Sequence, residues 1–242
     1  MDHGHSAVSA GGRAAAWLVH AFTATGAVLA FLAVMAILEE RWGLALVWLL
    51  VALLVDGIDG SFARMARVKE RAPRIDGDTL DLVIDYLTYV FVPTLFLWKA
   101  GLVPEPLIAP LAALIQLSSL YHFARSDMKT KDNYFQGFPA LWNLVAFYLY
   151  VAGAGPTTGA IAVVALAALT FAPVHFVHPF RVTDYGRWLP LTAIGWSLST
   201  AALLWTGWSE DARAAVLGVS LASAAVLLAM GLLRSVRGPR TA

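Results

Sequence analysis

Aspartates are concentrated in residues 56–85, a stretch of 30 residues that holds six of them within largely apolar sequence. Four of these form two pairs: Asp56 and Asp59 lie three residues apart, and Asp81 and Asp85 lie four apart. Residues at these spacings share one face of a helix, so each pair directs two carboxylates the same way. If the two helices are neighbours, the four carboxylates can converge on one site.

The hydrophobic composition indicates which elements carry these aspartates. Of the 242 residues, 59% are hydrophobic and 14% are charged, whereas soluble domains average about 25% charged residues. We therefore expect an all-α fold: a polytopic membrane helix bundle of about eight transmembrane helices, forming a single integral membrane domain over residues 1–242. The expected spans are 14–38, 44–66, 75–98, 106–124, 138–153, 159–177, 188–205 and 212–233. The stretch 56–85 then lies on the hairpin formed by the second and third helices.

Basic residues are distributed unevenly between the two sides of this predicted bundle. Of the 17 Lys and Arg residues, 14 fall on the side of the N-terminus and three on the other. The positive-inside rule then places both termini, and the loop between the aspartate pairs, in the cytoplasm. The use of 13 Arg against 4 Lys fits a bacterial source. We expect a protein of the bacterial cytoplasmic (inner) membrane whose active site faces the cytoplasm. The net charge of +1 indicates no nucleic-acid partner.

Carboxylates inside a membrane helix are costly, at about 2.5–3.5 kcal/mol each, and are usually functional. Divalent cations between them would relieve their mutual repulsion. Oxygen ligands favour a hard cation such as Mg²⁺, Mn²⁺ or Ca²⁺. Four shared carboxylates suit two ions about 3.5–4 Å apart, an arrangement used for displacement at phosphorus. Asp76 and Asp78 lie nearer the loop, where solvation accounts for them, although Asp78 also shares a face with Asp81.

Small residues surround the first aspartate pair, among them Gly57, Gly60 and Ala63. Small residues allow membrane helices to pack closely. They would equally allow a bulky ligand to lie against the backbone, and the sequence leaves both explanations open. Arg64, one turn beyond Gly60, is placed to meet an anionic ligand such as a diphosphate.

The complete pattern is Asp56-x2-Asp59-Gly60-x2-Ala63-Arg64, then 12 residues, then Gly77-x3-Asp81-x3-Asp85. It resembles the signature of the CDP-alcohol phosphatidyltransferase family. The gap of 12 residues is longer than the usual family spacing and is similar to that of the bacterial phosphatidylcholine synthases within the family. Residues 85–93 and 135–143 resemble the same subfamily, so the resemblance covers most of the chain.

The resemblance implies a reaction in which choline attacks CDP-diacylglycerol to give phosphatidylcholine and CMP. It implies that two ions, Mn²⁺ or Mg²⁺, are held by the four paired aspartates, Asp56, Asp59, Asp81 and Asp85. It also implies that Asp85 is the general base, and it suggests a homodimer. The residues implied to line the CDP-diacylglycerol site are Gly60, Ala63, Arg64 and Gly77.

Choline would further require a site for its quaternary ammonium group, which has no N–H donor. Aromatic faces are the expected partners of such a cation. Tyr89 is the favoured candidate because it lies four residues after Asp85 and shares its helix face, and Tyr86 is a second candidate. Ordinary aromatic packing is the alternative explanation for each.

Two alternatives to this function stay open at the level of sequence. Another acceptor, such as serine, inositol phosphate or glycerol phosphate, would use the same chemistry with extra cationic side chains. A cation transporter would use the buried aspartates as its ion site. Transporters often pair interrupted helices from two related halves, whereas the aspartates here gather in one hairpin, so we favour the enzyme.

Overall fold

The computed structural model describes residues 9–179 and 181–239, which form an all-α membrane helix bundle with a small two-stranded sheet. The chain divides into two compact units, residues 1–92 and 93–242. The single membrane domain expected from the sequence stays a prediction.

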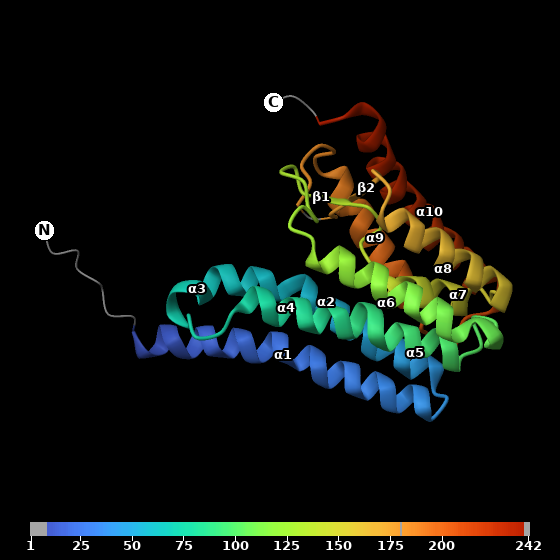
Figure 1. Cartoon of the computed structure of the whole chain (residues 1–242), viewed down its shortest axis with the longest axis horizontal. Coiled ribbons are helices and arrows are strands. Elements are labelled where there is room, and N and C mark those ends of the chain that lie inside the picture. The colour runs from blue at the N-terminus through green and yellow to red at the C-terminus, as the bar shows by residue number, and fades with distance from the viewer. Residues whose placement is uncertain (1–8, 180, 240–242) are drawn as a thin grey trace, which may run out of the picture. The chain divides into compact units, whose positions relative to one another are not determined.

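The first unit is built around a long N-terminal helix. Its elements are α1 (Ala10–Leu38), α2 (Trp42–Ala66), α3 (Val68–Arg71), α4 (Gly77–Asp85) and η1 (Tyr86–Phe91). Helix α1 packs along α2 and also contacts α3, α4 and η1 (Figure 1). The hairpin predicted to carry the aspartates therefore packs against a third helix, α1.

Small residues allow α1 to approach its neighbours closely. The buried face of α1 includes Gly26, Ala30 and Ala33, spaced three or four residues apart. A Cβ atom on Gly26 would overlap the side chain of Ile84, the residue before Asp85. Close helix packing through small residues is typical of membrane proteins, and here it brings α1 against the part of α4 that carries the second aspartate pair.

The connection between α2 and α4 is a structured segment. Helix α2 ends at Arg67, whose φ of 51° is left-handed, as is common for a residue that terminates a helix. The short helix α3 follows. Asp76 is the N-cap residue that precedes α4, and its carboxylate accepts backbone N–H bonds from Asp78 (3.0 Å) and Thr79 (3.2 Å). These two hydrogen bonds cap the helix. The bonds from Thr79 and then Asp78 also lower the pKa of Asp76.

A π-helical segment follows the second aspartate pair directly. Residues Tyr86–Phe91 form η1, and the N–H of Val92 donates to the carbonyl of Leu87, five residues earlier. The chain continues as α5 (Val92–Lys99). Short π-helical segments within α-helices occur frequently at functional sites.

The second unit contains most of the remaining helices. Its elements after α5 are η2 (Glu105–Leu107), α6 (Ile108–Ala124), β1 (Tyr134–Gln136), α7 (Trp142–Val151), α8 (Pro156–Thr170), β2 (His175–Val177), α9 (Trp188–Ala202) and α10 (Glu210–Arg237). Helix α6 contacts α8, α9 contacts α10, and α10 contacts β2 (Figure 1).

Strands β1 and β2 pair antiparallel, with Tyr134 opposite Val177. Beside them, the ring of Phe135 stacks on His178 at 5.7 Å. Burial, and then the cations of Arg181 and Lys129, lower the pKa of His178 to about 4.

An ion pair ties the chain before β1 to the last helix. Nε of Arg234 on α10 donates to Oδ2 of Asp132 at 2.7 Å, and only 9% of the Arg234 side chain is exposed.

The residues 137–139, Gly-Phe-Pro, form the turn that leads from β1 toward α7. Gly137 has a φ of +75°, and a Cβ atom there would overlap the carbonyl of Thr170. Its N–H donates to the carbonyl of Val174 at 2.7 Å. These contacts give the glycine a structural role in the turn, a role that the sequence left open.

Five helices of the described chain are long and apolar enough to cross a membrane: Ala10–Leu38, Trp42–Ala66, Gly77–Lys99, Glu105–Ala124 and Glu210–Arg237. The spans predicted at 138–153, 159–177 and 188–205 correspond to shorter helices of 10, 15 and 15 residues. Fifteen residues extend only about 22 Å, against about 30 Å of hydrocarbon. The count of eight is therefore approximate.

The predicted boundaries at 138 and 177 are wrong. Helix α7 begins only at Trp142, and residues after Thr170 turn into β2. Hydropathy marks a residue as apolar without distinguishing a helix from a buried turn or strand, and Phe138 is buried outside any helix. The apolar runs therefore extended these two spans beyond the helices.

Candidate active site

Helix α2 carries the first aspartate pair in its second half. Asp56 and Asp59 lie one turn apart, as the sequence predicts. Asp59 is buried, and its Oδ2 accepts a hydrogen bond of 2.8 Å from the hydroxyl of Thr23 on α1. Because an unpaired buried carboxylate is costly, Thr23 both stabilises Asp59 and fixes its orientation.

Three of the four paired aspartates come together. One carboxylate oxygen each of Asp56, Asp81 and Asp85 lies within 4.8 Å of the others, and all three side chains are half-buried. Asp59 lies outside this group of three, with one oxygen directed to Thr23. The convergence of α2 and α4 on one site is thus present, whereas the fourth ligand, Asp59, stays a prediction.

The chemistry of this carboxylate cluster (Asp56, Asp81 and Asp85) fits a divalent cation. Oδ1 of Asp85 is buried and has no hydrogen-bond partner among the described residues. Buried polar atoms are almost always paired, and a cation bound to the cluster would satisfy this oxygen. The donors are all carboxylate oxygens, which suit a hard ion such as Mg²⁺ or Mn²⁺.

Tyr89 contacts the cluster through its hydroxyl group. The hydroxyl donates to Oδ2 of Asp56 at 2.5 Å, and the residue is only 5% exposed. The sequence indicated its aromatic ring as a surface for choline, but it did not foresee this hydrogen bond. Tyr86 is half-buried at the start of η1. A role for either ring in binding choline stays a prediction.

The residues predicted to line the nucleotide occupy the helices around the cluster. Ala63 packs against a buried apolar cluster that includes Ala16 of α1 and Ala66 of α2, which gives it a structural role. Arg64 is exposed and donates to the hydroxyl of Ser61 at 3.0 Å. Gly60 on α2 and Gly77, the first residue of α4, are both half-buried.

The two remaining aspartates of the stretch have structural partners. Asp76 caps α4, and Asp78 accepts a bond of 2.6 Å from Lys69 on α3. Hydrogen bonding to Asp78 raises the pKa of Lys69. Both Asp78 and Lys69 are exposed, so this pair joins the α2–α4 connection to the first turn of α4 at the surface. Among the described residues, neither Asp76 nor Asp78 belongs to the group formed by Asp56, Asp81 and Asp85.

Sequence reasoning missed the contribution of α1. His20 and Thr23, three residues apart, are buried on the face of α1 that packs against the site helices. The signal was available, because a histidine and a threonine at helical spacing interrupt an apolar span. What the sequence could not supply was the register of α1 against α2 and α4.

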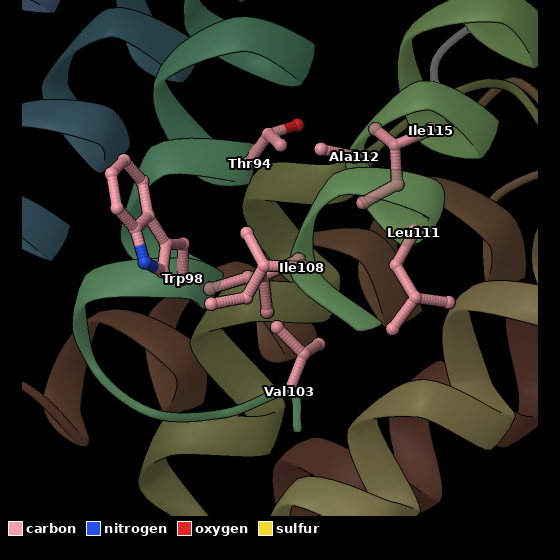
Figure 2. Close-up of a pocket in the computed structure, with 8 residues that line it drawn as sticks. Thr94, Trp98, Val103, Ile108, Leu111, Ala112 and Ile115 are labelled. Carbon is pink, nitrogen blue, oxygen red and sulfur yellow. The ribbon is translucent and has the colours of Figure 1, made fainter. Parts of the chain in front are cut away.

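A shallow pocket of ≈ 10 Å³ lies elsewhere in the chain, between α5 and α6. It is lined mainly by apolar side chains, including Trp98, Ile108 and Leu111 (Figure 2). It has room for about one water molecule and contains none of the residues of the 56–85 stretch. We assign it no part in the chemistry.

Comparison with known proteins connects this site to a family. A family model described as CDP-alcohol phosphatidyltransferase matches residues 17–174. A Pseudomonas aeruginosa protein named phosphatidylcholine synthase is 45% identical over 192 residues, which cover 79% of this chain and 81% of the relative. A protein of the same name from Bradyrhizobium diazoefficiens is 46% identical, over 89% of this chain and 79% of the relative. Another from Agrobacterium fabrum is 48% identical, over 69% of this chain and 69% of the relative. The family match includes most of α1, both aspartate pairs and Tyr89. The chain belongs to the CDP-alcohol phosphatidyltransferase family.

Proposed function

We propose that this membrane enzyme transfers the phosphatidyl group of CDP-diacylglycerol to choline, forming phosphatidylcholine and releasing CMP. The observation that carries the proposal is the cluster of Asp56, Asp81 and Asp85, built by the family signature in a chain whose relatives are named phosphatidylcholine synthase. The same observation favours an enzyme over a cation transporter.

The cluster would hold the divalent cation, Mg²⁺ or Mn²⁺. When bound, such ions neutralise the diphosphate and stabilise the charge that develops on the leaving group. We propose two ions with Asp59 as the fourth ligand, because it lies one turn from Asp56 on the same helix. Its hydrogen bond from Thr23 would orient it, as outer partners orient metal ligands elsewhere.

Asp85 is our candidate for the general base. An alcohol is a weak nucleophile at neutral pH, so its proton must be removed as it attacks. Asp85 would accept the proton of the choline hydroxyl on a carboxylate oxygen. The choline oxygen then bonds to the phosphorus that bears diacylglycerol, the bond from that phosphorus to the CMP oxygen breaks, and CMP leaves as an anion.

The rest of the substrate would lie around the cluster. Gly60 and Gly77 would allow the nucleotide and diphosphate to approach the backbone, and Arg64 would pair with a phosphate oxygen. Ala63 would contribute mainly by packing. The quaternary ammonium of choline would lie against the rings of Tyr86 and Tyr89, with the carboxylates nearby.

The reaction and its acceptor can be tested together. The purified protein is reconstituted with CDP-diacylglycerol, and CMP release is measured with choline, serine or glycerol 3-phosphate. We expect release with choline, loss of release on chelation of divalent cations, and recovery with Mg²⁺ or Mn²⁺. Release with serine but not choline would overturn the acceptor, and full activity after chelation would overturn the metal.

Asp85→Asn tests the general base. A positioned base contributes about 10²–10⁴-fold, so we expect a fall in kcat of that size. Asp211→Asn is the matched control, because Asp211 is an exposed residue in the first turn of α10. Equal activity of the two variants would exclude Asp85 from this role.

The sidedness of the protein and its oligomeric state are further proposals. We propose that both termini and the active site face the cytoplasm of a bacterial inner membrane, and that the enzyme is a homodimer. The chain has no cysteine, so a single introduced cysteine is a unique label. In intact cells, a membrane-impermeant maleimide should label Glu105→Cys and spare Glu70→Cys, and the reverse pattern would contradict the orientation.

A further inference from the structure

His20 on α1 is a buried histidine whose side chain the structural contacts leave incomplete. It is 5% exposed, and its Nε2 has no hydrogen-bond partner among the described residues. A neutral imidazole has one N–H donor and one nitrogen acceptor, and a protonated ring has two donors. Buried polar atoms are rarely left unpaired, so we infer that Nε2 of His20 forms a hydrogen bond with a bound ligand.

The ring lies against the signature glycine of α4. A Cβ atom on Gly77 would be 3.1 Å from Cε1 of His20 and 3.6 Å from Nδ1. Nε2, the unpaired nitrogen, is bonded to Cε1, the ring atom nearest to Gly77. The absence of a side chain at residue 77 therefore allows the imidazole to lie this close to the start of α4.

This position adjoins the carboxylate cluster. Gly77 lies four residues before Asp81, one turn along the same face of α4. Thr23, which donates to Asp59, lies one turn from His20 along α1. His20 is thus next to both aspartate-bearing helices, at the end of α4 farther from Asp85.

We propose that His20 binds the CMP portion of CDP-diacylglycerol, with Nε2 hydrogen-bonded to a ribose hydroxyl or a phosphate oxygen. This inference rests on the proposed function. It favours the nucleotide over choline for two reasons. The trimethylammonium group of choline offers no hydrogen-bonding atom, and the base proposed for its hydroxyl, Asp85, lies two turns along α4 from Gly77.

The test separates binding of CMP from support of the fold. Gln can place an amide group near the position of Nε2, whereas Asn cannot reach so far from the backbone. We expect His20→Gln to keep the Kd for CMP, measured with Mn²⁺ by calorimetry, within about threefold. Loss of a hydrogen bond to a charged phosphate oxygen costs about 10–150-fold in affinity, and loss of one to a ribose hydroxyl costs less. We therefore expect the Kd for CMP and the KM for CDP-diacylglycerol to rise for His20→Asn and His20→Ala, by the larger factor if the partner is a phosphate oxygen. The KM for choline should change less than about twofold.

Thr25→Ala is the control for a change on the same helix, because Thr25 is exposed and its hydroxyl bonds to the carbonyl of Phe22. It should leave both KM values unchanged. If all His20 variants keep the wild-type Kd for CMP, or if Gln and Asn lose it equally, the inference is wrong. A lower unfolding temperature with unchanged Kd would assign His20 a packing role only. Absence of choline-dependent CMP release by the wild type would instead overturn the proposed function.

Discussion

Tyr89→Phe removes one oxygen atom from the site and keeps the aromatic ring. In the wild type this oxygen donates to Oδ2 of Asp56 at 2.5 Å within a buried environment. The substitution therefore separates two proposed roles for Tyr89: orienting a carboxylate of the proposed metal site through its hydroxyl, and contacting choline through its ring.

The size of the effect follows from the kind of bond. A hydrogen bond to a charged group contributes about 1.5–3 kcal/mol, which corresponds to about 10–150-fold in an equilibrium constant. Outer partners of metal ligands typically contribute 10–100-fold in metal affinity. We therefore expect Tyr89→Phe to raise the Mn²⁺ concentration for half-maximal CMP release by about 10–100-fold, with kcat largely recovered at saturating Mn²⁺.

The assay is CMP release over a Mn²⁺ titration, at saturating CDP-diacylglycerol and at several choline concentrations. Tyr150→Phe on α7 is the matched control, because it makes the same chemical change at a residue whose ring packs edge-on against Phe96. It should leave the Mn²⁺ dependence unchanged.

An unchanged Mn²⁺ dependence in Tyr89→Phe would refute the positioning role of the hydroxyl. Tyr89→Leu completes the comparison, because it removes the ring as well. If Tyr89→Leu raises the KM for choline well beyond the value for Tyr89→Phe, the ring also contacts choline, as the sequence predicts. Equal KM values for choline in the two variants would remove Tyr89 from the choline site.

Three further expectations concern other contacts. Thr23→Val removes the donor to Asp59 and should weaken Mn²⁺ activation by about 10–100-fold, whereas Thr23→Ser should restore it; identical Mn²⁺ titrations for both variants would contradict this. His178 has a pKa of about 4, below its ordinary 6.5, so the folded state binds fewer protons than the unfolded state between these values. Stability should therefore fall as pH is lowered from 6.5 toward 4, and His178→Gln should flatten this dependence in thermal unfolding experiments; a parallel pH profile would count against it. Arg234→Met should lower the free energy of unfolding by about 1–3 kcal/mol. A double-mutant cycle with Asp132→Asn should show a coupling free energy between the two residues. If it shows none, the ion pair does not contribute to stability.

The convergence of the aspartates was accessible from sequence because it depends on local periodicity. Spacings of three and four residues fix which carboxylates share a helix face, and a short connection makes the two helices neighbours. Asp56, Asp81 and Asp85 accordingly meet. The hydrogen bond of Asp59 was not accessible, because its donor, Thr23, lies 36 positions away in the sequence.

The polar atoms surrounding the aspartates were harder to predict for the same reason. The hydroxyl of Tyr89 on η1 donates to Asp56 on α2, and His20 on α1 lies against Gly77 on α4. Both contacts depend on the rotation and height of one helix against another, which hydropathy does not encode. The sequence indicated the type of residue at each position but left its partner open.

The π-helical segment η1 affects how sequences of this family should be aligned and altered in length. A π-helical turn contains one residue more than the α-helical turn that it replaces. A chain one residue shorter within 86–91 can therefore form an ordinary α-helix there while the helical faces on either side keep their directions. Such a deletion would preserve Asp81 and Asp85, which precede the segment, but it would change the helical position of residues within the segment, which includes Tyr89. A change in the length of this segment would thus leave Asp81 and Asp85 in place and would act on the hydrogen bond between Tyr89 and Asp56.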